Sequence, residues 1–197
     1  MRAAKPGKRK DGPFFAILPT PGYSLATGFT ADIDGDVSFY TDKKFKGTLS
    51  FFDFDGQYSR YNQVFAQSNS ILFFHHDKLQ LTGDWRYYNF PTSTYGLGSY
   101  TSFADENRIS YSYIRFYETA VYRIGVNTLA GIGYNFDYHW HIKENPVSPG
   151  VKTDLAKYGY SGSSVSSGTT VNLIYDSRNN IHSPTSGEYL RFQFCTH

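Results

Sequence analysis

The longest regular pattern in the chain is an alternation of apolar and polar residues from Val121 to His139. Its even-numbered positions are mostly apolar, and its odd-numbered positions are mostly small or polar. Because strand side chains alternate between two faces, this stretch predicts a strand with one apolar and one polar face. Strands of soluble proteins usually have about 3–10 residues, whereas a tilted strand that crosses a bilayer needs about 9–11 and can extend beyond it. The pattern therefore predicts a transmembrane β-barrel strand, with even-numbered side chains toward lipid and odd-numbered ones toward the lumen.

Shorter alternating or aromatic-rich segments occur along the rest of the chain. Together they predict about nine strands, and hence an all-β fold: an antiparallel transmembrane β-barrel of outer-membrane type that is incomplete. The segments are Phe14–Leu18, Thr27–Ile33, Val37–Thr41, Thr48–Tyr58, Gln63–Phe74, Leu79–Phe90, Arg108–Tyr117, Val121–His139, Thr169–Asp176 and Tyr189–Phe194.

Turn residues separate these segments. Pro19, Pro21 and Gly22 predict a break in the first strand, and Asp34-Gly35 predicts a hairpin turn. We expect a second such turn at Asp53, Asp55 and Gly56, and a tight turn at Glu118-Thr119.

The connections differ in length. Two long loops are expected at Pro91 to Asn107 and Trp140 to Ser167, and other connections at Asp42 to Lys44, His75 to Lys78 and Ser177 to Gly187. Long loops on one side and short turns on the other are typical of outer-membrane barrels, so we expect the two long loops outside the cell and the other three in the periplasm.

Composition agrees with a barrel. Of 197 residues, 19% are aromatic, with 18 Tyr and 17 Phe, and the mean hydropathy is −0.47, because lumen-facing polar residues dilute the average. The sequence contains no run of about 18 apolar residues, so it predicts no transmembrane helix. The net charge of +2 is too balanced to indicate nucleic acid as a partner. The single Cys195 excludes a disulfide framework within the chain.

The termini are expected to be truncations of a longer protein. Residues 1–12 are basic and contain no apolar segment of the kind found in secretory signals, so they predict a disordered leader or linker. Residues 13–197 would form the partial barrel domain. The end of the chain resembles the middle of a strand, so we expect that the chain does not fold autonomously.

Two other segments carry groups that could bind a metal ion. Asp32 to Asp36 has the carboxylate spacing of an EF-hand, but glycine stands at loop position four instead of six. His139 and His141 with Asp137 would place two imidazoles on one strand face, but no third zinc ligand is apparent. Aromatic and imidazole groups at a membrane interface are the favoured interpretation. Neither a nucleophile elbow nor a glycine-rich phosphate loop occurs, so the sequence predicts no enzyme, no metal and no cofactor.

Three segments resemble a known family. Asp176, Arg178, Asn180, Pro184 and Gly187 are similar to the "D-x-R-[DN]-N … P-x-x-G" strand end of the bacterial surface antigen family, the barrel of the BamA/TamA class. The segment Phe90-Pro91 with Tyr95, Gly96 and Gly98 is similar to the family's "FP … FYGLG" segment, and Pro21 to Gly28 is similar to its opening "GYSPETG" strand.

The first motif also has a physical explanation. Asp176 and Arg178 would share the luminal face of a strand, about 7 Å apart at 3.3 Å per residue, where neighbouring strands can bond to them. Asn179-Asn180 favours a turn, Pro184 fixes φ, and Gly187 gives the freedom to begin the next strand. The alternative is an ordinary β-turn with an exposed ion pair in a soluble sandwich.

The resemblance implies a 16-stranded barrel in the cell outer membrane with a role in outer-membrane protein assembly or translocation. Implied partners are outer-membrane lipid, unfolded outer-membrane proteins and periplasmic accessory proteins. Two alternatives stay open: a passive pore, and the membrane anchor of a larger protein such as a patatin-like phospholipase. A soluble aromatic-rich β-sandwich is a third.

Overall fold

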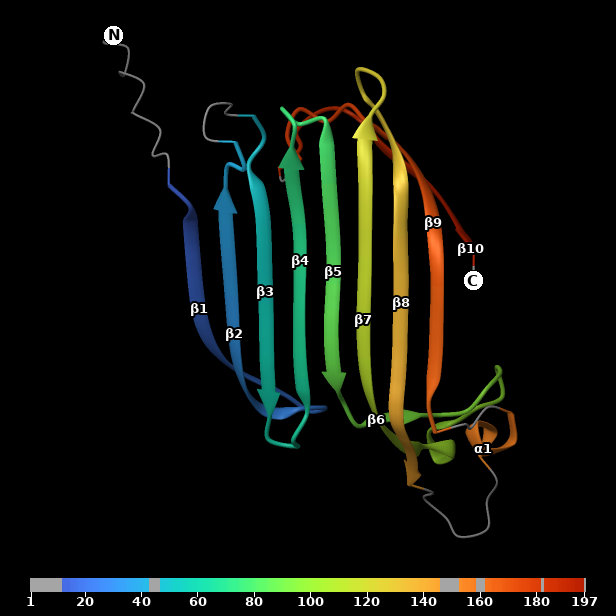
Figure 1. The fold of residues 1–197 in the computed structure, drawn as a ribbon. Helices are drawn as coiled ribbons and strands as arrows, with labels where there is room; N and C mark the ends of the chain where they lie inside the picture. Colours follow the sequence, from blue (N-terminus) through green and yellow to red (C-terminus); the bar gives the residue numbers. More distant parts are fainter. Residues whose placement is uncertain (1–11, 43–46, 146–152, 159–161, 182, 197) are drawn as a thin grey trace.

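A computed structural model describes residues 12–42, 47–145, 153–158, 162–181 and 183–196. Its strands form one antiparallel sheet in the order β1-β2-β3-β4-β5-β7-β8-β9-β10, and the short β6 pairs with β7 (Figure 1). The predicted all-β class and the path of about nine strands are confirmed. The strands are β1 (Phe14–Ser24), β2 (Gly28–Phe39), β3 (Ser50–Ser59), β4 (Val64–Phe74), β5 (Leu79–Asn89), β6 (Thr92–Thr94), β7 (Asn107–Arg123), β8 (Thr128–Asn145), β9 (Ser164–Asp176) and β10 (Tyr189–Thr196).

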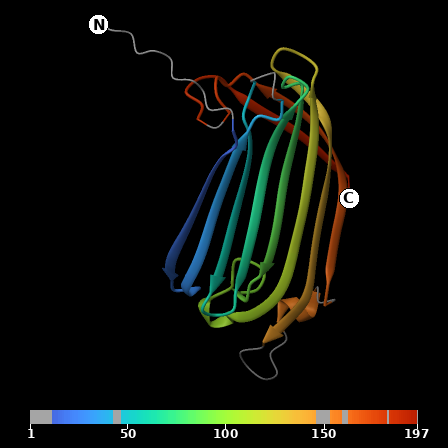
Figure 2. The same ribbon diagram turned by 60° about the vertical axis from the view of Figure 1, so that its left-hand side comes forward.

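The sheet is a curved, open wall. Its two edges are β1 and β10, and the curvature carries β9 and β10 to the back of the view (Figure 2). The small helical elements are the 3-10 turn η1 (Phe103–Asp105) and the helix α1 (Asp154–Tyr158). In the part of the chain that the structure describes, no helix has the length and apolar character needed to cross a membrane. Of the predicted leader 1–12, residues 1–11 lie outside the described residues.

The longest strands are β7 and β8, but the expected boundary between them is wrong. β7 continues through Glu118-Thr119, and the chain turns at residues 124–127. The alternation that begins at Val121 therefore covers the end of β7, the turn and most of β8. The turn was missed because it places two apolar residues at even-numbered positions, so it does not interrupt the pattern.

Two expected turns on β2 and β3 are also wrong. Asp34-Gly35 lies inside β2 and pairs with both β1 and β3, and Asp53 to Gly56 lies inside β3. Although these residues favour turns locally, pairing with a strand on each side provides hydrogen-bond partners for their backbone groups, and this outweighs the local preference. The expected break at Pro19 and Pro21 is absent because β1 is an edge strand, where proline is tolerated.

The connections gather at two ends of the sheet (Figure 1). One end holds the connections β2–β3, β4–β5, β7–β8 and β9–β10; we call it the short-turn end. The other, which we call the long-loop end, holds the β5–β7 loop with β6 and η1, the β8–β9 loop with α1, and the tight β1–β2 and β3–β4 turns. The expected grouping of connections is therefore correct, although β8 and β9 extend further than predicted and shorten the second loop to residues 146–163.

The side chains along each strand alternate between the two faces of the sheet, and these faces differ in character. On the concave face, which we call the inner face, Val121 and Leu129 are buried; on the convex outer face, Tyr122, Ile132 and Tyr134 are exposed. The predicted separation of odd- and even-numbered side chains in this region is confirmed. The outer face carries most of the large exposed hydrophobic residues, including Phe15, Ile17, Ile33, Phe54, Trp85, Ile114, Phe116, Val171, Leu173, Phe192 and Phe194.

Candidate functional site at the short-turn end

The motif residues Asp176 and Arg178 form a two-pronged ion pair. Strand β9 ends at Asp176, so the chain bends and the guanidinium of Arg178 donates from Nε and Nη2 to the two carboxylate oxygens, at 2.9 and 2.8 Å. The backbone N–H of Arg178 donates to the same carboxylate at 3.1 Å. The sequence predicted that both side chains face the lumen, but not that they bond to each other.

The ion pair is partly shielded from water. The exposed fractions of the Arg178 and Asp176 side chains are 22% and 17%. The carboxylate bonds raise the pKa of Arg178, and its guanidinium also lies 4.4 Å from the centre of the Tyr189 ring on β10. Arg178 therefore ties the end of β9 to the start of β10.

Asn179 holds the two halves of the β9–β10 loop together. Its side-chain oxygen accepts from the backbone N–H groups of Thr185 and Ser186, at 3.1 and 3.2 Å, and its backbone N–H donates to the Ser186 carbonyl at 3.1 Å. Gly187 closes the loop with φ +101°, and a Cβ there would lie 2.3 Å from the carbonyl oxygen of Ser177. Glycine is required at this position both for its φ and for the close approach of the backbone.

The other two predicted motif residues also lie in this loop. The Asn180 side chain accepts a hydrogen bond from the backbone N–H of Ser183 at 3.1 Å, which is a local turn, and Pro184 is exposed at the tip. The motif thus runs from the last residue of β9 through one compact connection.

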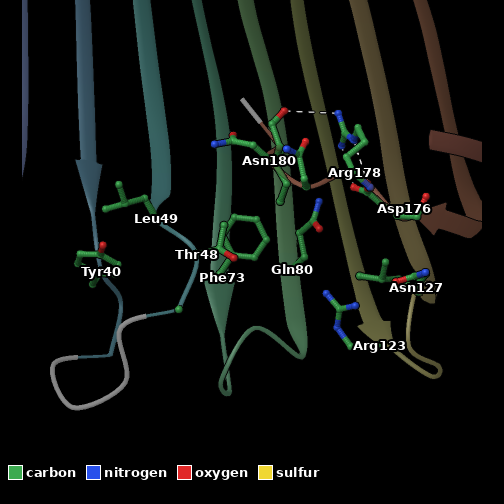
Figure 3. Close-up of a pocket in the computed structure, with 15 residues that line it drawn as sticks. Tyr40, Thr48, Leu49, Phe73, Gln80, Arg123, Asn127, Asp176, Arg178 and Asn180 are labelled. Carbon is green, nitrogen blue, oxygen red and sulfur yellow. Dashed lines mark hydrogen bonds and ion pairs between the residues drawn. The ribbon is translucent and has the colours of Figure 1, made fainter. Parts of the chain in front are cut away.

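The loop crosses the end of the inner face and lines one side of an open cavity of about 560 Å³ (Figure 3). Tyr40 and Leu49 line it from the β2–β3 connection, Gln80 and Arg123 from β5 and β7, and Asn180 from the loop. Segments far apart in the sequence therefore meet here.

Apolar side chains pack beneath the loop on the inner face. Val121, Leu129 and Ile174 form a buried cluster with exposed fractions of 1%, 3% and 5%. Phe73 on β4 is also buried and lines the cavity. The loop thus caps a small core at an end that would otherwise be open.

The neighbouring turns are tied to the same end by backbone bonds. The N–H of Asp176 donates to Asn127 in the β7–β8 turn, and that of Arg123 donates to Lys78 in the β4–β5 turn, both at 2.8 Å. The Arg123 side chain donates to the Val126 carbonyl at 2.7 Å.

The second predicted motif lies at the long-loop end, so the structure does not bring the two motifs together. Gly96 and Gly98 both have positive φ, +88° and +104°. Asp154 of α1 approaches Gly96 and accepts from the backbone N–H of Leu97 at 2.8 Å, which ties the two long loops together. Tyr95 packs edge-on against Phe103 at 5.8 Å.

Sequence reasoning missed an ion network on the inner face. Arg115 of β7 lies 3.2 Å from Asp137 of β8 and 3.6 Å from Asp84 of β5, which in turn pairs with Arg86 at 2.6 Å. The Asp137 carboxylate also accepts from the hydroxyls of Tyr113 and Tyr117. Strand periodicity puts each residue on the inner face, but only the register shows that they are neighbours.

Other inner-face groups show no catalytic or metal-binding arrangement in the described part of the chain. His139 stacks on Tyr113 at 4.4 Å, while Asp137 is used by the ion network. No group of three or more His, Cys, Asp and Glu side chains among the described residues is placed to hold a metal ion. The segment from Gly159 to Ser161 lies outside the described residues.

Comparison of the chain with protein-family models, with curated proteins and with solved structures gives no match. The resemblance to the bacterial surface antigen family therefore stays a prediction that rests on the motif residues.

Proposed function

We propose that this chain is part of the membrane-spanning wall of an outer-membrane β-barrel. The observation that carries the proposal is the difference between the two faces of one long, curved antiparallel sheet. The outer face exposes aromatic and aliphatic side chains, and the inner face carries the Asp84, Arg86, Arg115 and Asp137 network. Lipid outside and water inside would account for both faces.

The lengths of the strands support the same proposal. β7 and β8 contain 17 and 18 residues, more than the roughly 9–11 that a tilted strand needs to cross a bilayer. Every strand of the path except the two edges is paired on both sides, which is what a hydrocarbon environment demands of the backbone.

We propose further that the barrel is of the bacterial surface antigen type and acts in the assembly or translocation of outer-membrane proteins. The motif from Asp176 to Gly187 supports this role, because its residues build the loop at the short-turn end instead of lying scattered. Lipid, unfolded outer-membrane proteins and periplasmic accessory proteins would be its partners.

Two measurements test the proposal at its two levels. The protein, purified in detergent and reconstituted, should float with phospholipid vesicles in a density gradient; a protein that stays soluble without detergent would contradict the membrane wall. In the producing cells, depletion of the protein should lower the folded amounts of other outer-membrane barrels. A change in solute uptake alone would indicate a passive pore instead.

A further inference from the structure

The outer face is almost free of charge along the paired, described strand positions. When β6 and the part of β7 and β8 beyond the irregularity at Ser110 and Ser112 are left aside, Glu118 is the one Asp, Glu, Lys, Arg or His among these positions. It lies opposite Gly83 of β5 and Tyr134 of β8. If the wall spans a membrane as proposed above, this carboxylate faces hydrocarbon, where ionisable groups are costly and usually functional.

Glu118 lies in a small polar notch. Trp85 donates from Nε1 to Glu118 Oε1 at 2.8 Å. A Cβ on Gly83 would lie 2.8 Å from Ser70 Oγ, 3.0 Å from Glu118 Oε1 and 3.4 Å from Trp85 Nε1, so these three groups converge over the glycine. The missing side chain leaves the carboxylate accessible from outside.

A buried hydroxyl on this face, that of Ser68, lacks a hydrogen-bond partner in the described part of the chain. Ser68 of β4 pairs with Trp85 of β5 and with Phe54 of β3, and it is 9% exposed. Its buried Oγ has no hydrogen-bond partner among the described residues. Ser68 lies beside Trp85, next to the notch formed by Ser70, Trp85 and Glu118 over Gly83, so this part of the outer face has unused hydrogen-bonding capacity at Ser68.

Aromatic rings frame the notch. The indole of Trp85 stacks on Phe116 at 6.1 Å with an interplanar angle of 3°, and Phe52 meets it edge-on at 6.4 Å. The N–H bond places the Glu118 carboxylate at the edge of the Trp85 indole, so the attraction for a cation comes from the charge of the carboxylate in apolar surroundings. Trp85 supplies one donor to a group that can accept several hydrogen bonds.

The depth of the notch favours a protein side chain over a lipid headgroup. Tyr122, next to the end of β7, lies four residues from Glu118 on the same face, about 13 Å along the strand, so the carboxylate lies well inside the end of the strand. The notch is therefore deeper than the amine of a phospholipid.

We propose that the Glu118 notch is an interaction surface within the membrane for a partner segment that carries a lysine or arginine side chain. The cation would be held by the carboxylate, with the Trp85 and Phe116 rings beside it. The inference rests on the proposed membrane wall and adds a lateral partner to it.

Hydrophobic transmembrane peptides of about 20 residues provide the probe, one with a central arginine and one with leucine in its place. The protein, labelled with a dye on the exposed Cys195, is reconstituted in phosphatidylcholine vesicles, and energy transfer to a dye on the peptide reports binding. The arginine peptide should bind about tenfold more tightly than the leucine peptide. Glu118→Gln, which keeps an acceptor for Trp85 but no charge, should abolish the difference; Asp55→Asn on the inner face should retain it.

Equal binding of the two peptides to the wild type, or a difference that persists in Glu118→Gln, would overturn the inference. Vesicles that contain phosphatidylethanolamine distinguish the other source of a cation: if they remove the preference, a lipid amine occupies the notch and the protein partner is wrong. Flotation of the same samples separates the two proposals. Protein that floats but shows no preference contradicts only this inference, whereas protein that does not float contradicts the membrane wall as well.

Discussion

The two ends of the sheet are built differently. At the short-turn end, the β9–β10 loop is fixed by Asn179, Gly187 and the Asp176–Arg178 pair, and it covers a buried apolar cluster. At the long-loop end, the described residues of the two long loops are joined by a hydrogen bond from the Leu97 N–H to Asp154 of α1. Packing over a buried cluster thus shapes the first end, whereas a loop-to-loop hydrogen bond links the connections at the second.

The largest expected effect comes from the location of the two ends, which should lie on opposite sides of the membrane. Tyr100→Cys at the long-loop end, where the native residue is 100% exposed, should react with a membrane-impermeant thiol reagent on intact cells, in a background with Cys195→Ser. Ser183→Cys at the short-turn end should react only after the membrane is opened. The reverse labelling would invert the orientation, with the long loops in the periplasm.

Alanine substitutions at two glycines with similar backbone geometry, one at each end, test how tightly each end is packed. Gly187 and Gly98 have φ +101° and +104°, so alanine is strained at both. A Cβ at Gly98 meets nothing within 4 Å, whereas one at Gly187 meets the Ser177 carbonyl at 2.3 Å. We expect Gly98→Ala to lower the free energy of unfolding by about 1–2 kcal/mol and Gly187→Ala by about 3–5 kcal/mol, measured by urea unfolding in micelles. Equal losses would mean that the β9–β10 loop is not packed as described.

Lysine substitutions at two arginines, one at each end, compare how much an ion pair contributes to stability at that end. Arg178→Lys removes the forked contact with Asp176 and should cost about 1–2 kcal/mol, because lysine cannot bond to both oxygens in the same plane. At the long-loop end Arg108 is 77% exposed and lies 3.9 Å from Glu106, so Arg108→Lys should cost at most about 0.5 kcal/mol. An equal, small effect of the two changes in urea unfolding would show that the Asp176–Arg178 pair is not structural.

The smallest effect should come from the capping box of η1. The backbone N–H and hydroxyl of Ser102 hold the pKa of Asp105 below its usual value of 3.8. Because the folded pKa is the lower one, the cap is complete above pH 4 and is lost as the pH falls through the folded pKa. The protection of the Ser102 amide against exchange, relative to its intrinsic rate at each pH, should fall only in that acidic range, and Asp105→Asn should remove this dependence. Loss of protection near neutral pH would contradict it.

Much of the fold could be predicted from strand periodicity, and most of the site from turn chemistry. The alternation gave the two faces of β8, and Gly187 was expected where a positive φ is needed. Register could not be predicted, because it depends on pairing between strands. For this reason Asp34-Gly35 was wrongly read as a turn, and the Arg115–Asp137 network was not found.

An inward-facing arginine on β8 cannot be placed at Gly131, because a Cβ there would lie 1.9 Å from the Ala120 carbonyl oxygen. Asn135 is better: it is half-buried on the inner face and pairs with Tyr117 and Gly168, so the adjoining strand leaves room for a longer side chain.

The central claim is that the outer face contacts lipid and the inner face does not, and one pair of arginine substitutions on β8 tests it. Ile132 is 69% exposed on the outer face, so Ile132→Arg should cost about 2–4 kcal/mol and reduce the folded, membrane-inserted fraction. Asn135→Arg, three residues away on the inner face, should change stability by less than about 1 kcal/mol. The measurement is the folded fraction of each full-length variant in phospholipid vesicles against urea. Loss of insertion by Ile132→Arg alone is the predicted result; equal tolerance of both arginines, or greater damage from Asn135→Arg, would contradict the membrane wall.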